Sequence, residues 1–270
     1  MSVPIDLLRR IDAYLDAAPR TGATGEPVGP FTLFVNGGGG WRYYARPTPG
    51  ARPVTPEDVV AVRERQRALG QPEAIEWVLD VSPGVGAAAG AAGMQVAERP
   101  LMHLATPDFR AAQTPHGGMV RVLDPNEDPA IAMAVAELGF ASEGTDPGPV
   151  GYRPARILAA RLERGALEFV GDRLRRGLTV TALATSGGEP AAVGSHQPLH
   201  DMSEIVGVTT LPAFRRRGLG AAVTSVLVRD ALERGADTVF LTAGNEEIAR
   251  VYERVGFRTI GRVGVATAPD

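Results

Sequence analysis

The stretch LPAFRRRGLGAAVTSVL, which runs from Leu211 to Leu227, holds three consecutive arginines, a Gly-Leu-Gly turn and then apolar residues at helical spacing. The first turn of a helix carries main-chain N–H groups without helical acceptors and a partial positive charge. Glycines let an anion approach those N–H groups closely, and arginine side chains add fork-shaped donors. The stretch therefore predicts a site for a pyrophosphate or a similar anion. Taken alone, it also fits a solvent-exposed basic helix start.

A second motif follows at residues 245–257, NEEIARVYERVGF. Residues 211–227 lack the G-x-G-x-x-G order of dinucleotide-binding loops and the G-K-[ST] of P-loops, so neither of these phosphate-binding motifs explains them. Leu211-Pro212, the R-x-x-G-x-G of residues 215–220 and the N-x-x-x-A-x-x-Y-x-x-x-G-F of residues 245–257 together resemble the GNAT superfamily of N-acetyltransferases, which use acetyl coenzyme A. The resemblance covers roughly residues 119–266 and is most specific after Ser203.

The resemblance implies how acetyl-CoA is held. Main-chain N–H groups of the loop bind its diphosphate, and main-chain groups of the preceding strand pair with its pantetheine arm. In this family the strands around Val208 and Leu241 splay apart to make a slot for that arm. The implied cofactor-binding residues are Thr209, Leu211, Arg215, Arg216, Arg217, Gly218, Leu219, Gly220, Ala221 and Asn245.

Three residues are candidates for the chemistry. An amine that attacks a thioester forms a tetrahedral oxyanion and expels a thiolate, which needs a proton. By the resemblance, Tyr252 is the general acid, although a buried structural tyrosine is the alternative. Glu204, which begins the strand before the loop, and His196, which lies within a strand, are the candidate bases. A one-residue register shift would turn Glu204 to the other face, His196 also fits a structural role, and water could relay the proton instead.

The amino-acid composition argues against several classes of binding partner. The net charge of −3 argues against a nucleic acid or an anionic membrane as the main partner. The absence of cysteine excludes disulfides and thiol nucleophiles, and the four histidines lack metal-ligand spacing, so we expect no metal. We see neither a signal peptide nor an apolar run of about 18 residues, and we expect a cytoplasmic protein. A homodimer is compatible with the sequence.

These features predict an N-acetyltransferase that moves the acetyl group of acetyl-CoA to a primary amine by direct attack. The acceptor, a small molecule or a peptide, stays open. The alternative is a non-catalytic regulatory module that binds CoA or acyl-CoA, because neither candidate base is decisive.

Strands and helices do not simply alternate, so the sequence predicts a mixed α/β (α+β) fold instead of a doubly wound sheet. Residues 74–104 and 237–266 share one outline: strand, short helix, glycine with a large apolar residue, strand. We therefore predict two GNAT-like domains, each a mixed, mostly antiparallel sheet flanked by helices, with the splayed strand pair in the second. The expected helices include residues 56–69 and 153–176, and residues 41–47 are expected to form a strand.

The predicted boundaries are 1–117 for a degenerate GNAT-like domain without a cofactor loop and 118–270 for the catalytic domain. In the repeat, Ala89 and Ser82 stand opposite Tyr252 and Asn245, so the first domain is expected to bind no acetyl-CoA. Trp41 and its neighbours Tyr43 and Tyr44 are predicted either to line a substrate cleft or, more simply, to pack in the protein interior.

Overall fold

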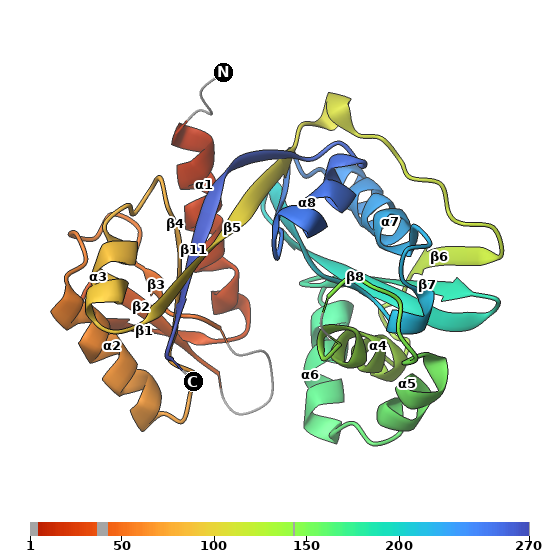
Figure 1. Cartoon of the computed structure of the whole chain (residues 1–270), viewed down its shortest axis with the longest axis horizontal. Helices are drawn as coiled ribbons and strands as arrows, with labels where there is room; N and C mark the ends of the chain where they lie inside the picture. Colours follow the sequence, from red (N-terminus) through yellow and green to blue (C-terminus); the bar gives the residue numbers. More distant parts are fainter. Residues whose placement is uncertain (1–4, 37–42, 143, 270) are drawn as a thin grey trace. The chain divides into compact units, whose positions relative to one another are not determined.

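The computed structural model of the chain describes residues 5–36, 43–142 and 144–269. The chain divides into two compact units (Figure 1). Unit 1 comprises Met1–Leu101 together with Thr259–Asp270, and unit 2 comprises Met102–Arg258. Both units combine strands with flanking helices, which confirms the predicted mixed α/β class.

Unit 1 is built around a three-stranded antiparallel sheet, β1-β2-β3, and the antiparallel pair of β4 with β11. The Trp77 ring lies over Gly264 of β11, where any side chain would clash with it. The elements are α1 (Ile5–Ala17), η1 (Pro19–Thr21), β1 (Thr24–Val28), β2 (Phe31–Val35), β3 (Arg46–Pro47), α2 (Pro56–Ala68), β4 (Ala74–Val78), α3 (Val85–Ala91), most of β5 (Gln95–Leu104) and most of β11 (Arg258–Thr267).

Sequence signals such as helix caps predict part of the secondary structure of unit 1. The predicted helix over residues 56–69 is α2, which begins after the N-cap Thr55. The expected strand over residues 41–47 is reduced to β3, and Trp41 lies outside the described residues. Tyr43 packs edge-on against Phe34 with ring centroids 6.2 Å apart, which favours the packing role over the cleft role for this residue.

Unit 2 carries a sheet in the order β10-β9-β8-β7-β6, in which β6 to β9 are antiparallel and β9 and β10 are parallel. The expected single helix over residues 153–176 is two helices, because Glu163 has an extended backbone. The elements are η2 (Thr106–Asp108), β6 (Gly118–Val122), α4 (Ala130–Phe140), α5 (Tyr152–Ala159), α6 (Arg164–Arg175), β7 (Val180–Ser186), β8 (Glu189–Leu199), β9 (Met202–Thr210), η3 (Pro212–Phe214), α7 (Leu219–Glu233), β10 (Thr238–Thr242) and α8 (Glu246–Glu253).

Helices cover both faces of the sheet in unit 2, with α7 on one side and α4 on the other (Figure 1). Successive strand residues point to opposite faces. Accordingly, Ala182 and Ala184 of β7 pack in the core cluster that includes α7, whereas Leu183 between them packs in the cluster that includes α4. This alternation fixes which side chains of β8 and β9 face which helix.

The division of the chain differs from the predicted boundary at residue 117/118. Unit 2 begins at Met102, because Met102 and Leu104 belong to its core with Phe257. It ends at Arg258, and the strand that follows pairs with β4 in unit 1. Most of β5 and most of β11, the last strands of the two copies of the sequence repeat, thus belong to unit 1, and unit 2 takes only the end of β5 and the first residue of β11.

Candidate active site

The start of α7 presents a run of main-chain N–H groups without protein acceptors. Arg216 (φ 62°) and Gly218 (φ 83°) adopt left-handed backbone conformations. The hydrogen bond from Ala222 N to Gly218 O (3.1 Å) begins the helical ladder, and within the described residues the N–H groups of residues 216–221 have no acceptor. Left-handed residues bend such a run into a concave nest that favours anions, and the helix dipole adds to this preference.

Arg215 does not contribute to that nest. Its guanidinium donates to four main-chain carbonyls, those of Thr210 (3.2 Å), Asp146 (3.2 Å), Gly139 (3.1 Å) and Ser142 (2.7 Å). Two of these carbonyls lie at the carboxyl end of α4, where cationic donors are favourable. Its own N–H donates to Pro212 O (3.2 Å). We therefore reassign Arg215 from cofactor binding to holding the loop against the end of α4.

The other two arginines of the triplet remain exposed. Arg216 Nη1 lies 3.6 Å from Glu247 Oε1, and the Arg216 side chain is 65% exposed. Arg217 donates to the carbonyl of Ala213 (3.0 Å) and lies over the Phe214 ring. Neither contact is buried, so both guanidinium groups can turn toward an anion at the nest.

The strands β9 and β10 form a fork beside this loop. Their parallel register joins Met202–Glu204 to Thr238–Phe240, although β9 continues to Thr210 and β10 to Thr242. The register of β9 with β8 shifts between Val193 and Ser195, opposite Gly207, which has φ 64°. A bulge of this kind re-aims the backbone of its strand. The sequence reasoning missed Gly207, although a glycine inside a strand is its usual signal.

Hydrogen bonding to β8 decides which main-chain groups of β9 are free. Leu211 N donates to Ala191 O (2.9 Å), so the Leu211 N–H faces β8. Main-chain groups alternate along a strand, so those of Thr209 also face β8 and those of Thr210 face the other edge. The predicted pairing of Thr209 and Leu211 with a pantetheine arm therefore does not fit the main chain of either residue, and the N–H on the other edge belongs to Thr210.

Tyr252, on α8, lies in the same core cluster as Leu219 at the start of α7 and Leu241 of β10. Its ring meets Phe257 edge-on, with centroids 6.1 Å apart, and it is 8% exposed. Burial raises the pKa of Tyr252 to about 12. The phenol therefore stays protonated at neutral pH, which is the form that a proton donor needs.

The candidate base Glu204 lies where the fork opens. It is the last β9 residue paired with β10, and its side chain is half-buried. Its neighbours Ser203 and Ile205 are on the α7 side of the sheet. By alternation Glu204 faces the α4 side, so its side chain lies on the opposite face from the α7 core.

The structure argues against His196 as a base. The imidazole is fully buried, Nδ1 lies 2.8 Å from Ser203 Oγ, and Nε2 lies 2.8 Å from Asp230 Oδ2 on α7. A carboxylate only accepts, so Nε2 carries the hydrogen and Nδ1 accepts from the serine hydroxyl. Burial lowers the pKa of His196. Both ring nitrogens are used inside the protein, and we reassign His196 to a structural role.

Asn245 caps α8. Its side-chain Oδ1 accepts from Ile248 N (2.9 Å), and its backbone is extended, as N-cap residues require. This local role accounts for an asparagine at the start of the second motif. The exposed amide nitrogen of the same side chain is left for a ligand.

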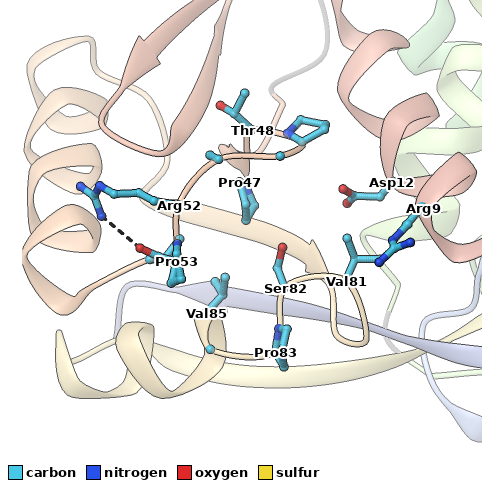
Figure 2. Close-up of a pocket in the computed structure, with 15 residues that line it drawn as sticks. Arg9, Asp12, Pro47, Thr48, Arg52, Pro53, Val81, Ser82, Pro83 and Val85 are labelled. Atoms are coloured by element: carbon cyan, nitrogen blue, oxygen red, sulfur yellow. Dashed lines mark hydrogen bonds between the residues drawn. The ribbon is translucent and has the colours of Figure 1, made fainter. Parts of the chain in front are cut away.

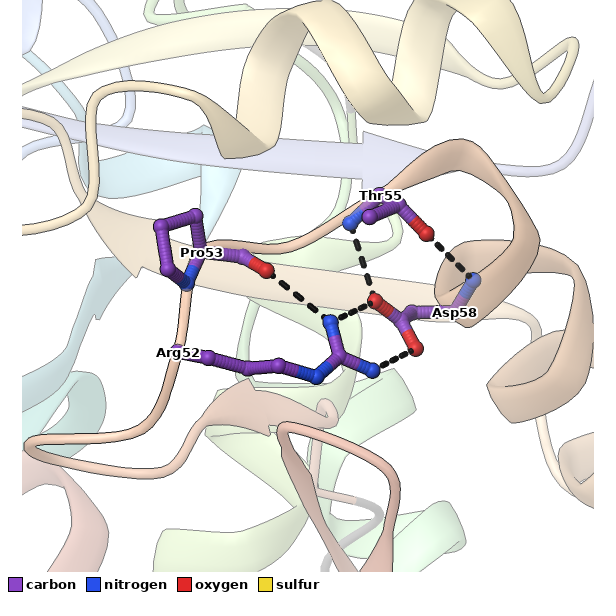
Figure 3. Close-up of polar contacts among 4 residues, drawn as sticks. All are labelled: Arg52, Pro53, Thr55 and Asp58. Carbon is purple, nitrogen blue, oxygen red and sulfur yellow. Dashed lines mark hydrogen bonds and ion pairs between the residues drawn. The ribbon is translucent and has the colours of Figure 1, made fainter.

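In unit 1, side chains already occupy the start of α2. In the sequence repeat, α2 stands at the position that α7 has in unit 2. Thr55 Oγ1 accepts from Asp58 N, and Asp58 accepts from Thr55 N at 2.9 Å (Figure 3). Arg52 donates to both Asp58 oxygens at 2.6 Å, and Pro56 has no N–H to offer. The pKa of Asp58 falls to about 2, mainly through Arg52. A carboxylate thus occupies the position that an anion would take.

Among the described residues, no group of three or more metal-ligating side chains is close enough together to hold an ion. None of the helices in that part of the chain combines the length and apolar character that a bilayer crossing requires.

Comparisons with known proteins found a family match for part of the chain and several structures of similar fold. A family model described as FR47-like protein matches residues 187–264. The structure is similar to a GCN5-related N-acetyltransferase from Kribbella flavida, with a TM-score of 0.72 and 21% identity over 97% of this chain and 96% of that chain. It is also similar to a tandem GNAT protein from the clavulanic acid biosynthesis pathway (TM-score 0.57, 15% identity, 89% and 79% covered).

A third similar structure is a GNAT-family acetyltransferase from Novosphingobium aromaticivorans (TM-score 0.52, 18% identity, 90% and 89% covered). No curated protein sequence matches the chain. At these identities the structural likeness establishes the fold, and function has to be argued from the site.

Proposed function

We propose that this chain, which has the fold of the GCN5-related N-acetyltransferases, transfers an acetyl group from acetyl-CoA to a primary amine. The observation that carries the proposal is the run of N–H groups of residues 216–221 at the start of α7, for which the described residues supply no acceptor. Six donors in a concave run at a helix N-terminus fit a diphosphate. The acceptor is a small molecule or a peptide.

The gap between β9 and β10 would hold the pantetheine arm of acetyl-CoA. A pantetheine arm contains amide groups, which can pair with the unpaired edge of a strand. The free edge near the loop includes the N–H of Thr210, and the gap between β9 and β10 opens after Glu204 and Phe240. The arm would then run from the nest toward the bulge at Gly207.

The chemistry follows from the groups around the fork. The amine nitrogen bonds to the thioester carbon, the carbonyl oxygen takes up negative charge, and the carbon–sulfur bond then breaks. Tyr252 gives its proton to the departing sulfur, and main-chain N–H groups near the bulge stabilise the oxyanion. The amine loses its proton to Glu204 or to water. Tyr252 suits its role because it is protonated and largely shielded from water.

The direct test is acetyl-CoA consumption by the full chain against a panel of primary amines, with release of free CoA as the signal. Turnover with at least one amine is expected. If CoA binds tightly and no amine in a broad panel is acetylated, the chain is instead a non-catalytic CoA-binding module. If CoA does not bind at all, the diphosphate assignment of residues 216–221 is overturned.

A further inference from the structure

Unit 1 contains a pocket of about 530 Å³ that has no part in the proposed acetyl transfer. Its walls come from α1, from the loop before α2 and from the segment between β4 and α3 (Figure 2). The volume is within the range of sites for small molecules. All the lining residues belong to unit 1.

A buried carboxylate dominates the charge of this pocket. The Asp12 side chain is 7% exposed, and Asp12 Oδ1 lies 3.7 Å from Arg46 Nη2, which is beyond hydrogen-bond distance. Arg46 is itself held by a second carboxylate, that of Glu76, through Nη1. Two carboxylates therefore share one guanidinium group, and a buried negative charge is left without its own countercharge.

Of the other two cations at the pocket, Arg52 is bound to a carboxylate and Arg9 lies in solvent. Arg52 holds both oxygens of Asp58 and also donates to the carbonyl of Pro53 (Figures 2 and 3). Arg9 is exposed, and its guanidinium lies 3.6 Å from the Asp6 carboxylate. Two carboxylates, Asp12 and Glu76, therefore lie against the single guanidinium group of Arg46, and this cluster of buried and half-buried charges has one negative charge in excess, which favours a cationic ligand.

The remaining lining indicates which kind of cation. In Figure 2 the Asp12 carboxylate and the Ser82 hydroxyl point toward the same space, from α1 and from the segment after β4. Within the described residues the Ser82 hydroxyl has no hydrogen-bond partner. The lining residues include no aromatic ring, so they cannot form the cage that quaternary ammonium groups prefer, whereas prolines and valines offer apolar walls.

We propose that this pocket binds a small primary amine, with its ammonium group on Asp12 and Ser82 and its carbon chain against Val81 and Val85. An ammonium donates three hydrogen bonds, which matches a carboxylate and a hydroxyl as acceptors. Burial raises the pKa of Asp12, and Arg46 offsets part of that effect. A second cation beside Asp12 would supply the missing countercharge.

The test uses n-butylammonium chloride and the neutral analogue 1-butanol as probes, with the methyl NMR signals of Val81 and Val85 as the readout. Saturable shifts at these methyls, with butylammonium bound about tenfold more tightly than butanol, are expected. Asp12→Asn should remove that preference. Asp16→Asn, one turn further along α1 and paired with Arg20, should keep it. The readout does not depend on acetyl transfer.

Ser82→Leu provides a second variant that leaves the Asp12–Arg46 pair in place and fills the pocket, so it should abolish the shifts for both probes. Equal affinity for the amine and the alcohol would overturn the proposal. So would unchanged binding in Asp12→Asn, or shifts that do not saturate in the parent chain. Far-UV circular dichroism of each variant shows whether the fold is retained.

Discussion

Gly218 and Gly220 stand two residues apart in the loop motif, yet the structure requires glycine at only one of them. Gly218 has φ +83°, which side chains rarely adopt, and a Cβ there would make one ordinary contact, 3.8 Å from Pro115 Cγ. Gly220 is helical, and a Cβ there would make ordinary contacts of 3.9–4.0 Å. The motif predicts both positions as cofactor-binding. Only the backbone angle shows that the loop needs glycine at Gly218, whereas Gly220 has a helical backbone that any residue adopts.

Gly218→Val should weaken CoA binding by at least about tenfold. A β-branched residue disfavours the left-handed backbone and would turn the N–H groups of the nest, and its bulk would keep a diphosphate away. Isothermal titration calorimetry measures the change. The matched control is Gly235→Val, which imposes the same backbone strain (φ +91°) at the other end of α7. Equal CoA affinity in Gly218→Val and the parent would refute the nest.

Tyr252→Phe should lower kcat by about 10²- to 10⁴-fold, because it removes the proton donor for the departing thiolate. The CoA dissociation constant should change by less than about twofold, since the ring and its contact with Phe257 are retained. Tyr14→Phe is the control, because it also removes a buried hydroxyl but lies in unit 1. Turnover at the parental rate would show that Tyr252 is not the acid.

The strands β8 and β9 show why the two candidate bases could not be separated from sequence. Both residues lie in strands, and a strand face is assigned only once its partners are known. The structure pairs His196 with Ile205 and puts both on the α7 side, which leaves Glu204 on the other face. The same dependence on register explains why the free N–H near the loop is that of Thr210 and not of Leu211.

His196→Asn should make the free energy of unfolding depend less on pH, and it should not remove a base from the reaction. The folded-state pKa of His196 lies below the unfolded value of about 6.5, so the unfolded chain binds the proton more tightly. The parent should therefore lose stability as the pH falls below 6.5, by up to about 2 kcal/mol at pH 5. Urea unfolding at several pH values measures this loss.

The control for that series is His200→Asn, which makes the same substitution in the exposed turn between β8 and β9. The pH profile of kcat/KM provides the second readout. If His196 were the base, His196→Asn would remove the acidic limb of that profile. An unchanged profile with lower stability is the outcome that the buried Ser203–His196–Asp230 hydrogen bonds predict.

The internal repeat predicted two similar units, but it could not show to which unit the last strand of each copy belongs. Both copies have the same apolar outline, so either strand satisfies the pattern. In the structure, residues 102–117 pack in unit 2: Ala112 N donates to Ser225 Oγ (2.9 Å), and Arg110 N donates to Val255 O (2.9 Å). The boundary between the two units is therefore set by contacts between residues far apart in the sequence, which the local sequence pattern does not predict.

A fragment of residues 102–258 should therefore fold, and a fragment of residues 118–258 should not. The shorter fragment loses the Met102 and Leu104 side chains from the core around Phe257, and it exposes apolar surface beside β10. Cooperative urea unfolding and CoA binding are the measurements. If the shorter fragment unfolded at the same urea concentration as the longer one, residues 102–117 would be a linker, as the predicted boundary implied.

The starts of α2 and α7 differ in whether their N–H groups are already occupied. We therefore expect the full chain to bind one CoA. At α7 the donors of residues 216–221 are free, whereas at α2 the Asp58 carboxylate and Arg52 already fill the equivalent place. A diphosphate at α2 would have to displace a carboxylate whose pKa is near 2, and it would meet like charge. Titration calorimetry should give a stoichiometry of one for the parent, and Gly218→Val should weaken that single binding event by at least about tenfold. Two sites in the parent, or a site of parental affinity that survives in Gly218→Val, would mean that unit 1 holds the cofactor in a way that its helix start does not show.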